Sequence, residues 1–333
     1  MMKIVLNFFL LLLLSGSTIA QQTTYAEKLG FKKGTKVIIL HVDDLGMSYA
    51  SNKGALLAIN DGLANSGSIM MPCPWVPGIA NYMKKHPGYD FGLHLTFTSE
   101  WDDYRWGPVA GVNCVPTLAD EQGKLWDNVG LVLKNTTNED FETEMRAQID
   151  LAIRMGIAPT HLDSHMGTIF AKPEFIQIYV RLGIEYGIPI LFPGGHNTIV
   201  SRDFKDDPGF MDQARQIGKQ LWAAGLPVVD DVISDTYDWR LPDGMKKSDK
   251  NLQDYKTSKF MERFNEMQPG ITEVILHCTD PSDVFEHITT SGETRKGDLL
   301  AMLDPKLKAY IEKEGIVLTT WKELSERRKK IKD

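Results

Sequence analysis

The feature that most constrains the fold of this chain is an alternation, repeated almost to its end, of short apolar runs with longer amphipathic segments. The runs that read as strands are 36–41, 68–71, 91–95, 160–163, 188–192, 228–234, 272–277 and 316–319. The clearest helical segments are 136–155, 173–186, 211–224, 251–267, 305–314 and 321–332. Strands that alternate with helices pair in parallel, because each helix carries the chain back to the start of the next strand.

Seven or eight such units, with no break in composition, predict one α/β domain over residues 35–333. We expect a (β/α) barrel, TIM-like but distorted, with seven or eight parallel strands. A doubly wound open sheet is the alternative that the same pattern allows. A long insertion at about 99–134 interrupts the alternation and holds several aromatic residues, among them Trp101, Trp106 and Trp126.

Residues 1–20 have the three parts of a secretory signal peptide: a basic residue, a short apolar run and a small-residue exit. The apolar run is too short to span a bilayer. We therefore expect residues 21–34 to be a linker and the mature protein to be exported, periplasmic or extracellular, without stable membrane insertion.

The three cysteines are too few for a disulfide framework.

The charge balance argues against one class of partner. The chain has 37 basic and 44 acidic residues, a formal net charge of −7. Nucleic-acid-binding proteins normally carry a basic surface. We therefore expect no nucleic-acid partner.

Residues suited to catalysis gather directly after four of the predicted strands. In a (β/α) barrel, functional groups lie at the C-terminal ends of the strands. The motifs, in chain order, are His41-Val42-Asp43-Asp44-Leu45-Gly46, Gly92-Leu93-His94, His161-Leu162-Asp163-Ser164-His165 and His277-Cys278-Thr279-Asp280. They hold five of the eight histidines of the chain, so we expect one site at this mouth of the barrel.

Asp43 and Asp44 are adjacent, and this constrains how both can act. Neighbouring side chains on a strand point to opposite faces, so two adjacent carboxylates reach one site only where the strand breaks into a loop. Gly46 permits such a break. One carboxylate can then ligate a divalent cation while the other stays free as a base. The alternative is a helix N-cap for a helix that starts near Ser48, but that role needs one acid, not two.

His161 and His165 are four residues apart, and the distance between their side chains depends on whether this segment is a helix or a strand. On a helix the pair could chelate one ion, whereas on an extended strand the same spacing separates them by roughly 13 Å. Because the run reads as a strand, we expect His165 to be a ligand and His161 to lie deeper. Asp163, between them, could orient a ligand or line the substrate pocket.

Asp44, His94 and His165 together supply one carboxylate and two imidazoles. Such a set makes a sound catalytic site for one divalent ion, with open positions for water. Zinc and magnesium are both compatible with these ligands, and the two imidazoles favour zinc.

The motifs together resemble those of a known family. The order Asp-Asp-x-Gly, Gly-x-His and His-x-Asp-Ser-His is similar to that of the YdjC-like carbohydrate deacetylases, which include chitooligosaccharide deacetylases, over about residues 36–280. The resemblance implies that Asp44, His94 and His165 bind the metal and that Asp43 is the catalytic base. His277 corresponds to a late histidine that faces the site, and we take it as the candidate acid.

The sequence also departs from the common family pattern. His41 stands where Asn is usual, Leu45 where Phe is frequent, and Cys278 where Pro is common. These differences leave the expected metal ligands in place and bear on the substrate.

The reaction implied by the resemblance is hydrolysis of the N-acetyl amide of an amino sugar or oligosaccharide. The ion would activate water and polarise the carbonyl. Trp101, Trp106 and Trp126 could offer flat faces to sugar rings. The alternative is that they pack the insertion against the barrel.

Two other functions stay open. The first is another metal-dependent hydrolase, acting on an ester or a phosphoester. Phosphoester chemistry usually places Arg or Lys near the metal, and none of the four motifs contains either. The second is a non-catalytic, exported sugar-binding protein, which would not need a spare carboxylate such as Asp43 beside the metal ligands.

Overall fold

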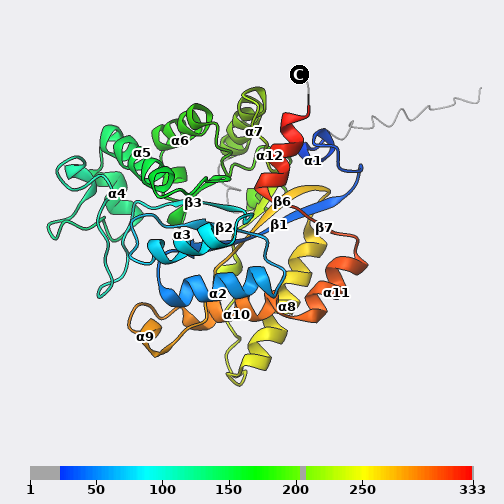
Figure 1. Cartoon of the computed structure of the whole chain (residues 1–333). Helices are drawn as coiled ribbons and strands as arrows, with labels where there is room; N and C mark the ends of the chain where they lie inside the picture. Colours follow the sequence, from blue (N-terminus) through cyan, green and yellow to red (C-terminus); the bar gives the residue numbers. More distant parts are fainter. Residues whose placement is uncertain (1–22, 203–207, 332–333) are drawn as a thin grey trace, which may run out of the picture.

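The computed structural model describes residues 23–202 and 208–331 (Figure 1). The predicted signal peptide, residues 1–20, lies outside the described residues. Within the described ranges, no helix combines the length and the apolar character that a membrane span requires.

A parallel sheet forms the centre of the protein. Its strand order is β4-β3-β2-β1-β6-β5. The strands are β1 (Lys36–Leu45), β2 (Ser66–Ile69), β3 (Phe91–Leu95), β4 (Leu162–Ser164), β5 (Asp231–Ile233), β6 (Gly270–Leu276) and β7 (Val317–Leu318). The short β7 lies off this path and pairs with the start of β1, in the register Val37–Val317.

The predicted strand 188–192 is not a regular strand, yet it links the two ends of the sheet. Ile190 forms an isolated parallel bridge with Leu162 of β4, and Pro193 forms one with Val229, just before β5. Pro189 and Pro193 have no N–H to donate to a strand ladder, which explains why only single bridges form. The extended segment nevertheless spans the gap between β4 and β5, so the prediction of a distorted (β/α) barrel is confirmed.

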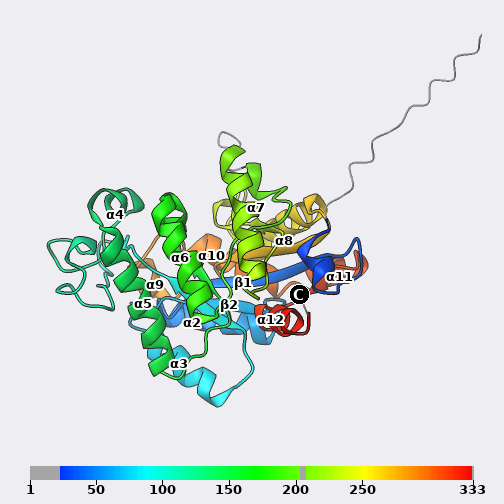
Figure 2. The ribbon, with the colours of Figure 1, turned by 90° about the horizontal axis from the view of Figure 1, so that it is seen from above.

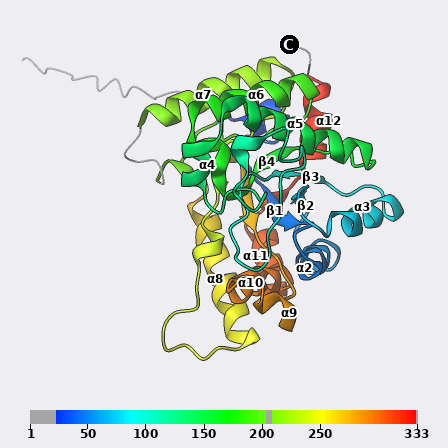
Figure 3. The same ribbon diagram turned by 90° about the vertical axis from the view of Figure 1, so that its left-hand side faces the viewer.

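Helices surround the sheet on both sides. They are α1 (Tyr25–Lys28), α2 (Tyr49–Asn60), α3 (Val76–Lys85), α4 (Val129–Asn135), α5 (Asn138–Arg154), α6 (Pro173–Tyr186), α7 (Pro208–Ala223), α8 (Asp249–Glu266), α9 (Asp283–Glu286), α10 (Gly292–Met302), α11 (Pro305–Lys313) and α12 (Trp321–Lys329). Figures 1 and 3 place α5, α6 and α7 on one side of the strands and α2, α8 and α10 on the other. Viewed from above in Figure 2, the C-terminal α12 lies close to α1.

Part of the segment 21–34, which we expected to be a linker, is folded against the barrel. It contains α1, and Tyr25 and Ala26 are buried. The carboxylate of Asp230 accepts hydrogen bonds from the backbone N–H groups of Tyr25 (2.9 Å), Ala26 (3.1 Å) and Ile271 (2.9 Å). A buried carboxylate needs such donors. The hydrogen bonds from Tyr25 and Ala26 to Asp230 join residues about two hundred positions apart. A local sequence pattern does not predict such a contact.

One predicted helix boundary is wrong by one residue. We placed the start of the helix at Thr136, but Thr136 is the C-terminal cap of α4. The cap of α5 is Thr137, whose hydroxyl accepts a hydrogen bond from the backbone N–H of Asp140 (3.2 Å). Two adjacent threonines offer the same capping group, so the local sequence does not distinguish them.

Along each strand, side chains point alternately into the barrel interior and toward the surrounding helices. Ile38, Leu40 and Val42 of β1 belong to the large apolar core beneath the helices, whereas Val37 and Ile39 belong to a smaller apolar cluster that includes Trp321. This alternation follows from the two-residue period of a strand. It places His41 and Asp43 in the interior as well, above the apolar cluster and closer to the C-terminal end of β1.

Gly92 makes room for His161 in this interior. A Cβ atom at position 92 would lie 2.5 Å from the backbone oxygen of His161 and 2.6 Å from its ring. We therefore predict that Gly92→Ala destabilises the protein by about 1–3 kcal/mol through overpacking, measured as a lower midpoint of urea unfolding.

The matched control is Gly78→Ala in α3, where the nearest atom to an added Cβ is 3.5 Å away. That change should be neutral or stabilise the protein by about 0.5–1 kcal/mol, because alanine favours helices. Equal unfolding midpoints for the two variants would show that the fit between Gly92 and His161 is looser than described.

Candidate metal centre

The backbone turns at the end of β1, and this lets two adjacent carboxylates share one site. Asp44 has a φ of 66° and Gly46 a φ of 86°, both in the left-handed region. Ser48, not an aspartate, caps α2 by accepting a hydrogen bond from the N–H of Ser51. Asp43 and Asp44 are therefore free for another role, and both line one cavity.

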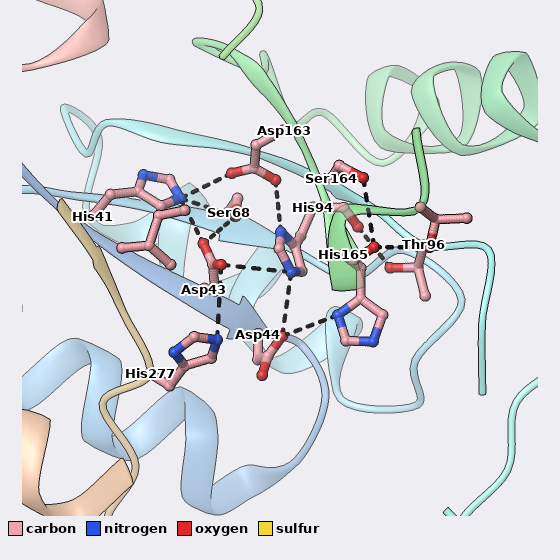
Figure 4. A network of polar contacts seen from close by, with 12 residues as sticks. His41, Asp43, Asp44, Ser68, His94, Thr96, Asp163, Ser164, His165 and His277 are labelled. Carbon is pink, nitrogen blue, oxygen red and sulfur yellow. Dashed lines mark hydrogen bonds and ion pairs between the residues drawn. The ribbon is translucent and has the colours of Figure 1, made fainter. Parts of the chain in front are cut away.

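Three side chains converge on one point at the mouth of the barrel (Figure 4). Oδ1 of Asp44 lies 3.4 Å from Nε2 of His94 and 3.5 Å from Nδ1 of His165. All three residues are buried, and this oxygen has no hydrogen-bond partner among the described residues. Asp44, His94 and His165, the three ligands expected from the sequence, thus lie together.

These donor atoms fit a divalent cation. Two ligand atoms that bind a tetrahedral zinc ion at about 2.1 Å lie about 3.4 Å apart, which matches both separations from Asp44. A buried carboxylate oxygen without a hydrogen-bond donor also needs a positive charge nearby.

Carboxylates behind the two histidines turn their near nitrogens toward Asp44. Nδ1 of His94 lies 2.6 Å from Oδ1 of Asp163. Nε2 of His165 lies 3.0 Å from Oε1 of Glu100. A carboxylate on the far nitrogen fixes the tautomer and the orientation of a metal-binding histidine. We expected Asp163 either to orient a ligand or to line the substrate pocket, and its contact with His94 suits the first of these roles. We did not predict Glu100, which lies at the start of the insertion and belongs to no motif.

Arg295 of α10 is a second site residue that the sequence pattern did not predict. Its Nη1 donates a 2.5 Å hydrogen bond to Oδ2 of Asp44, and its side chain is buried. Burial alone would raise the pKa of Asp44, but Arg295 and His165 hold it well below its usual value. The two residues are 251 positions apart in the chain, and no motif surrounds Arg295.

Asp43 lies beside the cluster with one oxygen held and the other turned to the cavity. Its Oδ1 lies 3.1 Å from Nε2 of His41 and 3.5 Å from the hydroxyl of Ser68. Its Oδ2 lies 3.7 Å from Nε2 of His94 and 3.9 Å from Nε2 of His277. This carboxylate therefore borders the candidate metal site, and the set of three donors is complete without it.

His277 faces the same cavity from the end of β6. Burial lowers its pKa, and its ring lies edge-on to Tyr237 with centroids 5.0 Å apart. A lowered pKa makes the protonated ring a stronger acid. The position suits proton transfer between His277 and a group bound near Asp43.

His161 lies deeper in the barrel, apart from Asp44. Its ring is fully buried and stacks on Trp321, with centroids 5.3 Å apart. Burial lowers its pKa well below the usual value. Directly after His165 the chain turns away through Met166 (φ 54°) and Gly167 (φ 63°). The four-residue spacing thus separates the two histidines into different layers, as an extended strand requires.

The cavity above the cluster has a volume of about 710 Å³. The polar residues of its lining include Asp43, Asp44, His165, His277 and Arg295. The apolar residues of its lining include Trp101, Phe170, Leu191, Phe192, Val232 and Ile275.

The three tryptophans of the insertion have different environments. Trp101 lines the cavity. Trp106 does not, because its ring is buried and its Nε1 donates to the backbone oxygen of Thr98. Trp126 donates to the backbone oxygen of Thr117 within the insertion. Trp106 therefore packs the insertion against the barrel. The sequence could not predict this, because an aromatic-rich segment does not reveal which of its rings face the cavity.

The cysteines form no bridge within the described residues, and Cys73, Cys114 and Cys278 are all free. Cys73 and Cys278 are buried, and burial raises the pKa of each thiol well above its usual value. They are therefore packing residues in their thiol form.

The family model described as YdjC-like protein matches residues 37–313, most of the chain. The chain belongs to the YdjC-like family. This family match covers all four motifs of the candidate site, from Asp43 to His277.

Two curated relatives of this YdjC-like protein are named carbohydrate deacetylase. The one from Thermus thermophilus is 36% identical over 167 residues, which cover 50% of this chain and 57% of that protein. The one from Thermoanaerobacter pseudethanolicus is 24% identical over 286 residues, which cover 86% of this chain and 98% of that protein.

A solved structure has a similar fold. It is a proposed cellobiose-phosphate cleavage protein from Enterococcus faecalis, with a TM-score of 0.67 and 18% sequence identity. The match covers 87% of this chain and 99% of that one. At this identity the likeness supports the fold alone.

We predict that His94→Ala lowers the affinity for zinc by at least about 100-fold. Loss of a residue that only supports a ligand costs about 10- to 100-fold, and His94 supplies one of three donor atoms. Zinc retained after dialysis, measured by mass spectrometry, is the readout. The control is His86→Ala, an exposed histidine after α3, which should retain zinc. A metal content that is unchanged in His94→Ala would rule out this centre.

Metal binding should also depend on pH. Burial alone would lower the pKa of both histidines. Glu100 and Asp44 nevertheless raise the pKa of His165 to about 10, and Asp43 and Asp163 raise the pKa of His94. A cation must therefore displace protons from these rings. We expect zinc affinity to rise with pH across the neutral range and protons to be released on binding, measured by calorimetry in buffers of different ionisation enthalpy. Binding without proton release would contradict this expectation.

Proposed function

We propose that this YdjC-like protein is a metal-dependent hydrolase that removes N-acetyl groups from an amino sugar or oligosaccharide. One observation carries the proposal: three metal-type donors at Asp44, His94 and His165 meet beside a carboxylate, Asp43, that is not needed to bind the ion. The curated relatives named carbohydrate deacetylase support the substrate class.

A divalent ion held by Asp44, His94 and His165 would polarise the amide carbonyl and lower the pKa of the attacking water. The protein's own groups do the rest. Arg295 holds Oδ2 of Asp44, so that Oδ1 faces the two histidines. Asp163 and Glu100 keep those rings in the orientation that ligation requires.

Asp43 is the general base in this proposal. Its Oδ1 is held by His41, whereas Oδ2 borders the cavity 3.7 Å from Nε2 of His94. A base must lie within hydrogen-bond reach of the proton that it removes. A water molecule bound beside His94 meets this condition, and its proton passes to Oδ2.

His277 is the general acid. Its Nε2 lies 3.9 Å from Oδ2 of Asp43, and both residues line the same cavity. The departing sugar amine needs a proton when the C–N bond breaks. Protonated His277 can donate it, and the proton that Asp43 takes from the water can pass to His277 over the 3.9 Å between the two groups, so that the protons balance.

The sugar itself would lie in the cavity, where Trp101 and Tyr237 offer aromatic surfaces. We also propose that the protein acts after export, on the basis of the signal-like residues 1–20.

A phosphoester substrate is the second candidate. The sequence motifs argued against it, whereas the position of Arg295 in the structure argues for it. The motifs contain no basic residue, but Arg295 lines the cavity beside the metal ligands. A guanidinium near the ion is what phosphate recognition needs. However, Arg295 is already paired with Asp44 at 2.5 Å, so we rank amide hydrolysis first.

Asp43→Asn tests the proposed base. The amide cannot accept a proton, so deacetylation of N-acetylated oligosaccharides should fall by about 10²–10⁴-fold, while zinc content and thermal stability stay unchanged. Released acetate is the readout. The control, Asp103→Asn, alters an exposed acid of the insertion and should keep full activity.

The outcome that would overturn the proposal is also defined. Wild-type, zinc-loaded protein that releases no acetate from any N-acetylated sugar, but releases phosphate from a panel of sugar phosphates, would favour the phosphoester candidate. Binding of sugars without turnover of either panel would favour a sugar-binding protein.

A further inference from the structure

His41 is fully buried in the barrel interior, and its contact with Oδ1 of Asp43 is its only part in the mechanism described so far. It lies directly below the site, on β1, two residues before Asp43. Three groups approach its Nε2: Oδ2 of Asp163 at 2.9 Å, the hydroxyl of Ser68 at 3.0 Å and Oδ1 of Asp43 at 3.1 Å (Figure 4).

The second ring nitrogen of His41, Nδ1, also has close polar neighbours. Nδ1 of His41 lies 3.1 Å from the hydroxyl of Ser66 and 3.5 Å from Oε1 of Glu273. Its edge meets the ring of His161, with centroids 4.8 Å apart. Burial alone would lower the pKa of His41, but Glu273, Asp163 and Asp43 raise it well above its usual value. Acidic side chains therefore lie beside both nitrogens of the ring.

The contacts of His41 decide which oxygens its two neighbours present to the site. Asp43 uses Oδ1 for His41, which leaves Oδ2 toward the cavity. Oδ2 of Asp163 lies at an ion-pair distance from His41 without forming a hydrogen bond, while Oδ1 pairs with Nδ1 of His94. Without a cation between them, two buried carboxylates would repel each other and lose these fixed orientations.

We propose that His41 is a positioning residue that couples the catalytic base to the metal-ligand system. Through one nitrogen it orients Oδ2 of Asp43 toward the attacking water, and through Asp163 it holds His94 in the tautomer that presents Nε2 to the ion. The inference rests on the proposed function for its catalytic half. Its structural half depends only on the arrangement of His41, Asp163 and His94.

Two variants test the catalytic half, His41→Asn and His41→Gln. Each removes the cation and retains a hydrogen-bonding side chain. We expect kcat for acetate release to fall by about 10- to 100-fold, as for other residues that support a metal ligand, with KM nearly unchanged because substrate contacts are intact. The control is Thr272→Val, which changes a buried polar residue in the middle of β6 and should keep kcat.

Nitrogen-15 spectra of the histidine rings test the structural half without any substrate. In the zinc-loaded wild type, His94 should carry its proton on Nδ1, and His41 should carry protons on both nitrogens. In either His41 variant, the Nδ1 proton of His94 should exchange faster with solvent. The wild-type spectrum needs no variant, so a neutral His41 would overturn the inference even where a substitution prevents folding.

The outcomes separate this inference from the proposed function. A wild-type protein without deacetylase activity would overturn the proposed function, and the spectra would still judge the role of His41. A neutral His41 in the wild type would overturn the inference. So would His41 variants whose kcat and His94 spectrum match those of the wild type, or a fall in kcat that Thr272→Val shares.

Discussion

A buried carboxylate oxygen without a hydrogen-bond partner is the constraint on which the rest of this structure depends. Oδ1 of Asp44 lies between Nε2 of His94 and Nδ1 of His165. Leaving a carboxylate oxygen buried and uncompensated costs several kcal/mol. The surrounding residues fit a cation at this point: Arg295 occupies the other oxygen, and Asp163 and Glu100 turn the two imidazoles inward. The three-donor arrangement follows from these partners.

The barrel supplies this arrangement through the period of its strands. Alternate residues of β1 run from the apolar cluster at Val37 and Ile39 through His41 to Asp43. β6 adds Glu273 and His277 on the same face, and the region of β4 adds His161, Asp163 and His165. The interior thus changes from apolar to charged along the barrel axis. In such an interior each carboxylate needs a cation or a donor, which is the role of His41 and Arg295.

Much of this was predictable from the sequence, and the limits have physical reasons. The alternation of strands and helices predicted the barrel, and the strand period predicted that His161 and His165 would lie in different layers. The sequence did not predict Glu100 or Arg295, because each reaches the site from an insertion or a helix rather than a strand end. It also misjudged residues 25–28, whose docking depends on Asp230, a carboxylate distant in sequence. Local patterns predict elements and strand-end residues, whereas partners joined only by tertiary contacts leave no local signal.

The most direct test of this account is anomalous diffraction at the zinc absorption edge from crystals of the zinc-loaded protein. The account predicts one strong peak about 2.0–2.2 Å from Oδ1 of Asp44, Nε2 of His94 and Nδ1 of His165, with Asp43 outside that distance. A peak bound by other residues, or a zinc-loaded crystal without density at these three atoms, would contradict it.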